Sequence, residues 1–184
     1  MALEPHEKMD RLLHVQLWSL TTLQQADRTQ TAHAEYRAEY NRGGDGGFDR
    51  QLVAFSDAHL LVVAANNLVT ALSRMKADMG VSSLSEGLTT VVTSLRDLFE
   101  HWEAGRPERQ GPIGPKWGAS LAKLQSEAPD GQPWAFIIDD GAGLVVAQAL
   151  EVSDLRKEVE RVLADARRSW TVARHELAGG ATPR

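Results

Sequence analysis

The sequence contains no cysteine among its 184 residues. This absence excludes a disulfide scaffold, a thiol nucleophile and any zinc or iron–sulfur site that is held by cysteine. Histidine is also scarce, and no two of the six histidines stand three or four positions apart, as they do on zinc-binding helices. We therefore expect neither a metal nor a cofactor.

Long apolar runs are missing as well. The longest uninterrupted stretch, Leu60–Ala65, is far too short to span a bilayer. Residues 1–7 show no cationic region followed by an apolar core, so the sequence predicts no secretion signal. We expect a cytoplasmic protein that has no membrane partner.

The chain also lacks an overall positive charge. Its net charge is −5, and its pI of about 5.7 excludes a basic footprint for nucleic acid over the whole protein. The cations are nevertheless 15 arginines against 5 lysines, a bias that favours phosphate and ion-pair recognition but is equally expected of a GC-rich genome. A hydrophobic content of 42% is typical of a globular chain. The length predicts a single domain over residues 1–177, followed by a flexible tail over residues 178–184.

Apolar periodicity predicts four long helices. They cover about residues 5–40, 49–79 and 83–104, and then from Ser153 or Asp154 to Leu177. Two apolar runs flank a turn at Asp139–Gly143, which indicates a β-hairpin over about residues 134–149. The expected fold is mainly α, a four-helix antiparallel bundle with a small β-hairpin between the third and fourth helices.

The first helix carries two stripes. Met9, Leu13, Leu17 and Leu20 share one stripe, which we interpret as its core face. The back of the helix carries a second, more aromatic stripe: Val15, Trp18, Thr22, Thr29, His33, Tyr36 and Tyr40. Either the helix is buried on two sides of its own bundle, or the aromatic residues Trp18, His33, Tyr36 and Tyr40 form an interface for self-association or a partner.

The second helix is apolar on nearly all sides between Leu60 and Leu72, which predicts a central position. Asn66 and Asn67 would then need hydrogen-bond partners inside the protein. His59 is expected to be a core or interhelical histidine.

The third helix has the clearest amphipathic pattern and opens with a capping box from Ser83 to Glu86. Arg96 and His101 flank its apolar stripe on opposite sides, and Asp97 lies farther round the helix. Asp97 and His101 stand four residues apart, so the carboxylate can orient the imidazole and favour its protonated form. The simpler interpretation is two ordinary helical charge pairs beside an apolar seam, each contributing a few tenths of a kcal/mol.

An arginine followed by a polar residue and then a histidine, on a helical bundle, resembles the HEPN superfamily. The segment Leu95–Glu103 also resembles a group of uncharacterised actinobacterial proteins. The resemblance implies a metal-independent endoribonuclease that acts as a homodimer on RNA, often as the toxin of a toxin–antitoxin pair or as a phage-defence effector. Other members of the superfamily have lost catalysis and act as binding or scaffolding proteins.

Carried over to this chain, the resemblance makes His101 the general acid and base at the ribose 2′-hydroxyl. Arg96 would bind the scissile phosphate, Asp97 would hold the imidazole, and Arg106 and Arg109 would contribute RNA binding. Arg96 and His101 lie on opposite flanks of the apolar stripe, so two subunits or a distorted helix are needed to bring them to one phosphate. Where toxin members paired with a nucleotidyltransferase antitoxin often carry tyrosine, this chain has Glu103, an acid that repels RNA.

Two functions therefore remain open. The first is a HEPN-like homodimeric endoribonuclease with a cognate antitoxin protein as a further partner. The second is a non-catalytic α-helical interaction or scaffold protein that dimerises or binds a partner protein.

Overall fold

The computed structural model describes residues 3–43, 47–101, 137–139, 144–146 and 150–179. In these residues the chain forms four α-helices: α1 Pro5–Asn41, α2 Gly47–Ser73, α3 Glu86–His101 and α5 Val152–Gly179. The predicted class is confirmed, a mainly α bundle with a small antiparallel hairpin between its last two helices.

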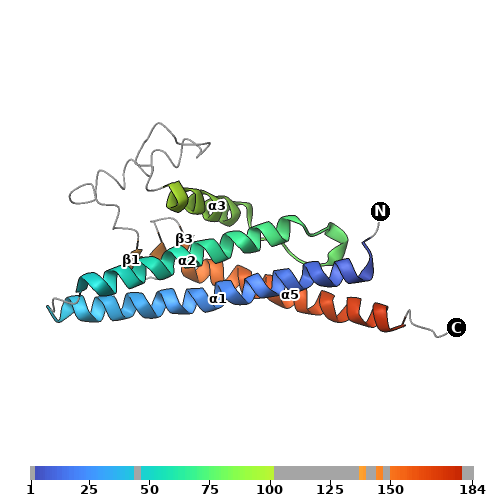
Figure 1. Ribbon diagram of the computed structural model, residues 1–184, viewed down its shortest axis with the longest axis horizontal. Coiled ribbons are helices and arrows are strands. Elements are labelled where there is room, and N and C mark those ends of the chain that lie inside the picture. The colour runs from blue at the N-terminus through green and yellow to red at the C-terminus, as the bar shows by residue number, and fades with distance from the viewer. Residues whose placement is uncertain (1–2, 44–46, 102–136, 140–143, 147–149, 180–184) are drawn as a thin grey trace.

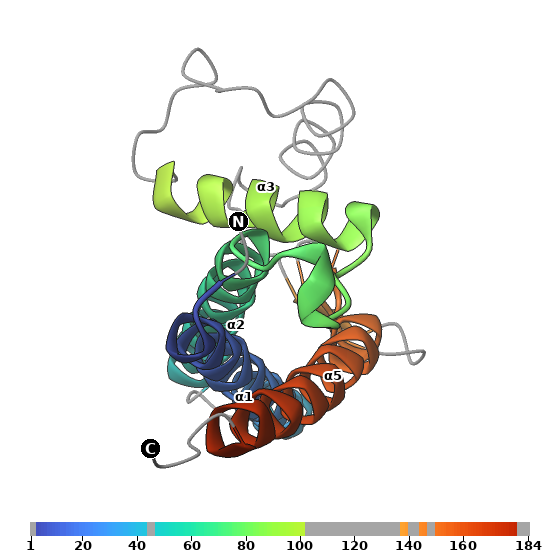
Figure 2. The ribbon, with the colours of Figure 1, turned by 90° about the vertical axis from the view of Figure 1, so that its right-hand side faces the viewer.

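The bundle is built on the antiparallel pair of α1 and α2, which run side by side over most of their length (Figure 1). Helix α5 packs along α1, and α3 lies on the outside of α2 and crosses it at a steep angle (Figure 2). Helices α2 and α5 thus meet α1 from different directions. In the part of the chain that the structure describes, α2 and α5 enclose the side of α1 that lies between them.

The hairpin joins β1, Ile137–Asp139, to β2, Leu144–Val146, with Ile138 opposite Val145. A third short strand that the sequence pattern did not indicate, β3 at Leu150–Glu151, pairs with β2 and leads directly into α5. Helix α5 begins at Val152, ahead of the predicted cap at Ser153 or Asp154, and continues two residues beyond the predicted end at Leu177. The predicted start of the hairpin at Trp134 lies outside the described residues.

The predicted core face of α1 is wrong at three of its four residues, and only Met9 packs against the core. Leu13, Leu17 and Leu20 are 56%, 52% and 40% exposed, whereas Val15 on the opposite side is fully buried. The enclosed side includes the stripe that the sequence placed at the back. Apart from Leu12 and Val15 its buried residues are small or polar: Ser19, Thr22, Gln25, Ala26, Thr29, Ala32 and His33. Small side chains let α2 and α5 approach α1 closely, so helix packing overrides the simple apolar stripe.

Helix α2 is shorter and more exposed than predicted. It ends at Ser73, and the expected continuation is a separate 3₁₀ turn at Ala77–Met79 that closes on Gly80. Leu60 is exposed, so the prediction of burial on nearly all sides is wrong at that position. Asn66 and Asn67 are only half-buried, which relieves them of the need for internal partners.

By length and composition alone the segment Asp49–Ser73 could cross a membrane, since its mean hydropathy reaches 1.5. The core helix of a bundle commonly has the same composition, and α2 packs against both α1 and α3. The segment is therefore weak evidence for a membrane.

Helix α3 begins later than predicted, and its cap is assembled from two parts of the chain. The hydroxyl oxygen of Ser85, not Ser83, accepts a hydrogen bond from the Leu88 N–H at 3.4 Å. The Ser85 N–H donates to the carboxylate of Glu158 in α5 at 2.6 Å. A carboxylate from another helix thus takes the place that the predicted capping box gave to Glu86.

Candidate functional site

Of the predicted catalytic residues, Arg96 and Asp97 have described side chains, and both are partly exposed on α3. Val92, Leu95 and Phe99 are buried and fix the face that α3 turns toward α2. The ring of Phe99 contacts His59 of α2, with centroids 5.1 Å apart, so His59 is the interhelical histidine that the sequence predicted. Arg96 and Asp97 are both partly exposed, which leaves them accessible to a ligand.

Arg96 and Asp97 form an ion pair with each other. The Nη1 of Arg96 lies 3.4 Å from Oδ1 of Asp97. Between partly exposed groups such a pair contributes about 0 to 1 kcal/mol. The resemblance assigns the Asp97 carboxylate to hold the imidazole of His101. In the structure this carboxylate contacts the guanidinium of Arg96.

His101 is the last residue of α3, and its side chain lies outside the described part of the protein. Arg106 and Arg109, the predicted RNA-binding residues, also lie outside the described residues. The structure therefore describes the side chains of Arg96 and Asp97 from the predicted catalytic set, and the approach of His101 to either of them stays a prediction.

The predicted aromatic interface divides between the interior and the surface. His33 is buried, Trp18 and Tyr36 are half-buried, and Tyr40 is exposed. The rings of His33, Tyr36 and Tyr40 follow one another along α1 with centroid separations of 6.2 Å and 6.1 Å. His33 therefore belongs to the bundle core, whereas Tyr40 lies at the protein surface.

A buried polar cluster links α1 to α2. The Nε2 of Gln25 donates to Oδ1 of Asp57 at 2.9 Å and to the Asp57 carbonyl oxygen at 3.0 Å. The Thr29 hydroxyl donates to the same carbonyl oxygen at 3.0 Å. Arg28 extends from the surface to Oδ1 of Asp57 at 3.1 Å, which pairs the buried charge. The cluster is fully partnered, as a structural element must be when it is buried.

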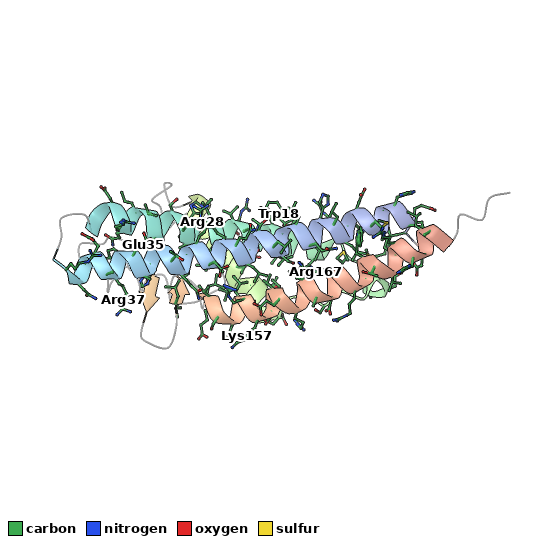
Figure 3. All side chains as sticks on the ribbon, turned by 90° about the horizontal axis from the view of Figure 1, so that it is seen from below. Trp18, Arg28, Glu35, Arg37, Lys157 and Arg167 are labelled. Atoms are coloured by element: carbon green, nitrogen blue, oxygen red, sulfur yellow. The ribbon has the colours of Figure 1, made fainter. Side chains whose placement is uncertain are left out.

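A cleft of about 230 Å³ opens between α1 and α2 near the N-terminal half of α1. Six polar or aromatic side chains line it: Arg11, His14, Trp18, Asn67, Thr70 and Arg74. Figure 3 shows Trp18 and Arg28 on the side of α1 that borders α2. Of these lining residues, sequence analysis had singled out Trp18 and Asn67 for other reasons.

The spacing of the cleft residues was a signal available in the sequence. Residues 11, 14 and 18 are three and four apart, and so are residues 67, 70 and 74, so each set lies on one helical face. Only the antiparallel pairing of α1 with α2 brings the two faces together.

The described residues contain no group of three or more metal-ligating side chains.

The opposite side of α1 carries the outer leucine face, which we define as Leu13, Leu17 and Leu20. No element in the described part of the chain covers these side chains, because α2 and α5 both lie on the other side of α1.

Comparison of the chain with protein-family models, with curated proteins and with solved structures found no match.

Proposed function

We propose that this chain is a non-catalytic helical interaction protein that pairs with a second copy of itself through the outer leucine face. The observation that carries the proposal is the exposure of Leu13, Leu17 and Leu20 on one side of a 37-residue helix. Three large apolar side chains in a row on a solvent-facing helix are typical of a surface that meets a partner.

The spacing of the leucines fits a second copy. Steps of four and three residues are the spacing of a coiled-coil seam, in which side chains of two helices interdigitate. In an antiparallel pair related by a two-fold axis near residues 18 and 19, Leu17 of each copy lies at the height of Leu20 of the other. The seam is then self-complementary, as a two-fold interface requires.

Charges beside the seam support the same arrangement. Asp10 and Arg28 stand eighteen residues apart, which is five full helical turns, so both lie on one flank of the seam. The two-fold axis that pairs Leu17 with Leu20 also brings Asp10 of one copy near Arg28 of the other. Arg28 remains 66% exposed in its contact with Asp57, so it has a guanidinium edge for a second carboxylate.

The expected affinity is low. Completing the burial of a half-exposed leucine contributes about 1 kcal/mol, and six leucines in a dimer contribute about 6 kcal/mol. Association costs at least about 4 kcal/mol in lost translational and rotational freedom, so leucine burial alone leaves about 2 kcal/mol. A dimer that forms at tens to hundreds of micromolar protein needs about 4 kcal/mol more, which the flanking charges and the helix contacts along the rest of the seam must supply.

Sedimentation equilibrium between about 5 and 500 µM tests the proposal. Wild type is expected to move from monomer to dimer in this range, and Leu17→Glu to stay monomeric. Val172→Glu is the matched control, because Val172 is 53% exposed on α5 away from this face, and it should dimerise as wild type does. A wild type that is monomeric at 500 µM, or a Leu17→Glu variant that dimerises normally, contradicts the proposal.

The charge pairing has a separate test. Asp10→Lys should weaken the dimer several-fold, because it places a cation beside Arg28 of the second copy. Asp78→Lys makes the same charge change on the exposed 3₁₀ turn and should leave the dimerisation constant unchanged. If both variants change the dimerisation constant equally, the effect comes from net charge alone, and the proposed antiparallel register is contradicted.

A second candidate function is the HEPN-like endoribonuclease, with Arg96, Asp97 and His101 in the roles described above. The accessibility of Arg96 and Asp97 on α3 favours it, since a phosphate-binding guanidinium must be reachable. Binding of RNA and a cognate antitoxin belong to this candidate. Its dimer would need to place the α3 helices of two copies near each other.

Incubation of the purified chain with RNA in chelator tests this candidate. Cleavage by wild type that is lost in both His101→Gln and Arg96→Gln supports it. Arg167→Gln, an exposed arginine substitution on α5, is the control that should cleave as wild type does. Equal cleavage by all four proteins indicates a contaminating nuclease, and no cleavage by wild type contradicts this candidate.

A further inference from the structure

We propose that the cleft between α1 and α2 binds a small aromatic oxyanion, a ring that carries a carboxylate or a phosphate. The proposal is independent of the dimer and of the nuclease, because it uses neither the outer leucine face nor α3. It rests on the kinds of side chain that the antiparallel pair brings together around about 230 Å³ of open space.

Two guanidinium groups in the lining supply the anion recognition. Arg11 is held in place by its neighbours: its Nη2 contacts Oε1 of Glu7 at 2.6 Å, and its Nη1 donates to the carbonyl oxygen of Arg74. The guanidinium of Arg74 and the imidazole of His14 have no hydrogen bond or ion pair with any described residue. Arginine side chains bind carboxylate and phosphate through paired N–H donors, so this end of the cleft favours an oxyanion.

The remaining lining specifies a ring. Trp18 is half-buried and lines the cleft, and Ala71 adds a small apolar side chain to the lining. An aromatic ring stacked on an indole gains about 0.5–1.5 kcal/mol beyond the area that it buries. Asn67 and Thr70 add a donor and acceptor for a polar substituent.

The volume limits the ligand. Pockets for drug-sized molecules usually measure about 300 to 1,000 Å³, so the cleft suits a single substituted ring. The cleft lining holds two arginines and no acidic side chain, and the nearby Glu7 carboxylate already pairs with Arg11. The local charge of the lining is therefore positive although the whole chain is acidic.

Isothermal titration calorimetry of the full chain with four probes tests the site. Phenyl phosphate and benzoate carry both the ring and the oxyanion, phenol carries only the ring, and inorganic phosphate carries only the anion. We expect saturable binding of phenyl phosphate or benzoate at least about tenfold tighter than that of phenol or inorganic phosphate. The stronger of the first two probes identifies which oxyanion the arginines prefer.

Variants locate the binding. Arg74→Gln should weaken phenyl phosphate or benzoate about tenfold or more, and Arg167→Gln on α5 should have no effect. Trp18→Leu should weaken both aryl anions and leave inorganic phosphate unchanged, with circular dichroism showing that the variant folds. Absence of saturable binding by any probe up to 10 mM, or equal affinity of Arg74→Gln and wild type, overturns the proposal.

Discussion

The Nε2 of Gln25 in α1 donates a hydrogen bond to the buried carboxylate of Asp57 in α2 at a distance of 2.9 Å. Asp57 also accepts an ion-pair contact from Arg28 at 3.1 Å, so one carboxylate ties two positions of α1 to α2. The pairing sets the register between α1 and α2. It thereby aligns residues 11, 14 and 18 with residues 67, 70 and 74 across the cleft.

Asp57→Ala should lower the free energy of unfolding by about 1–3 kcal/mol, because it leaves the buried Gln25 amide with one partner fewer. Arg28→Gln should cost less than about 1 kcal/mol, since the Arg28 side chain is largely exposed. Urea denaturation followed by circular dichroism measures both. A larger loss for Arg28→Gln than for Asp57→Ala would show that the surface charge, and not the buried amide bond, holds the register.

The reversed face of α1 gives a second prediction. Val15→Ala should lower the free energy of unfolding by about 1–3 kcal/mol, because Val15 is fully buried. Leu17→Ala should change it by less than about 0.5 kcal/mol when measured at low micromolar concentration, where the chain is monomeric. A larger loss of unfolding free energy for Leu17→Ala than for Val15→Ala would contradict this prediction and would assign the leucine stripe to the core.

Acid unfolding should depend on Asp165. The Ser82 hydroxyl donates a hydrogen bond to this carboxylate and lowers its pKa below the ordinary value. The Ser82 N–H at 3.1 Å, Arg168 and Arg161 lower the pKa further, while burial opposes them. Because the pKa is lowered in the folded state, the carboxylate stabilises the fold above about pH 3.9, and this stabilisation is lost as pH falls through the folded-state pKa.

We expect Asp165→Asn to be less stable than wild type between pH 5 and 7. The difference in unfolding free energy should shrink toward zero as pH falls below about 3.9. Urea denaturation at each pH from 3 to 7 measures the difference. A gap between the two proteins that stays constant down to pH 3 would assign the effect to packing and not to the charge.

Two glycines offer a matched pair of substitutions. Gly80 has φ of +66°, and an added Cβ would lie 3.2 Å from the Ser169 hydroxyl oxygen, so Gly80→Ala should cost about 1 kcal/mol or more. Gly87 lies in the first turn of α3 with nothing near an added Cβ, and Gly87→Ala should stabilise by about 0.4–1 kcal/mol. Thermal melts of both variants check the opposite signs.

The sequence by itself determined the helical class, the first helix to within a residue of its end, and the position of the hairpin. These features depend on local signals: apolar periodicity, a glycine-rich break after Asn41 and a glycine-containing turn after Asp139. It also located Arg96 beside the apolar seam of α3, because the spacing on a short, strongly amphipathic helix fixes which residues flank its buried face.

The tertiary structure alone decided which side of α1 is buried. Val15 and Leu17 stand two residues apart, and local periodicity favours the leucine, but α2 and α5 close around the side that carries Val15 and the small residues. It also decided that Glu158 completes the cap of α3 and that Arg11 meets Arg74 across the cleft. Such contacts join positions tens of residues apart, and their partners are set by how whole helices pack, which no local pattern encodes.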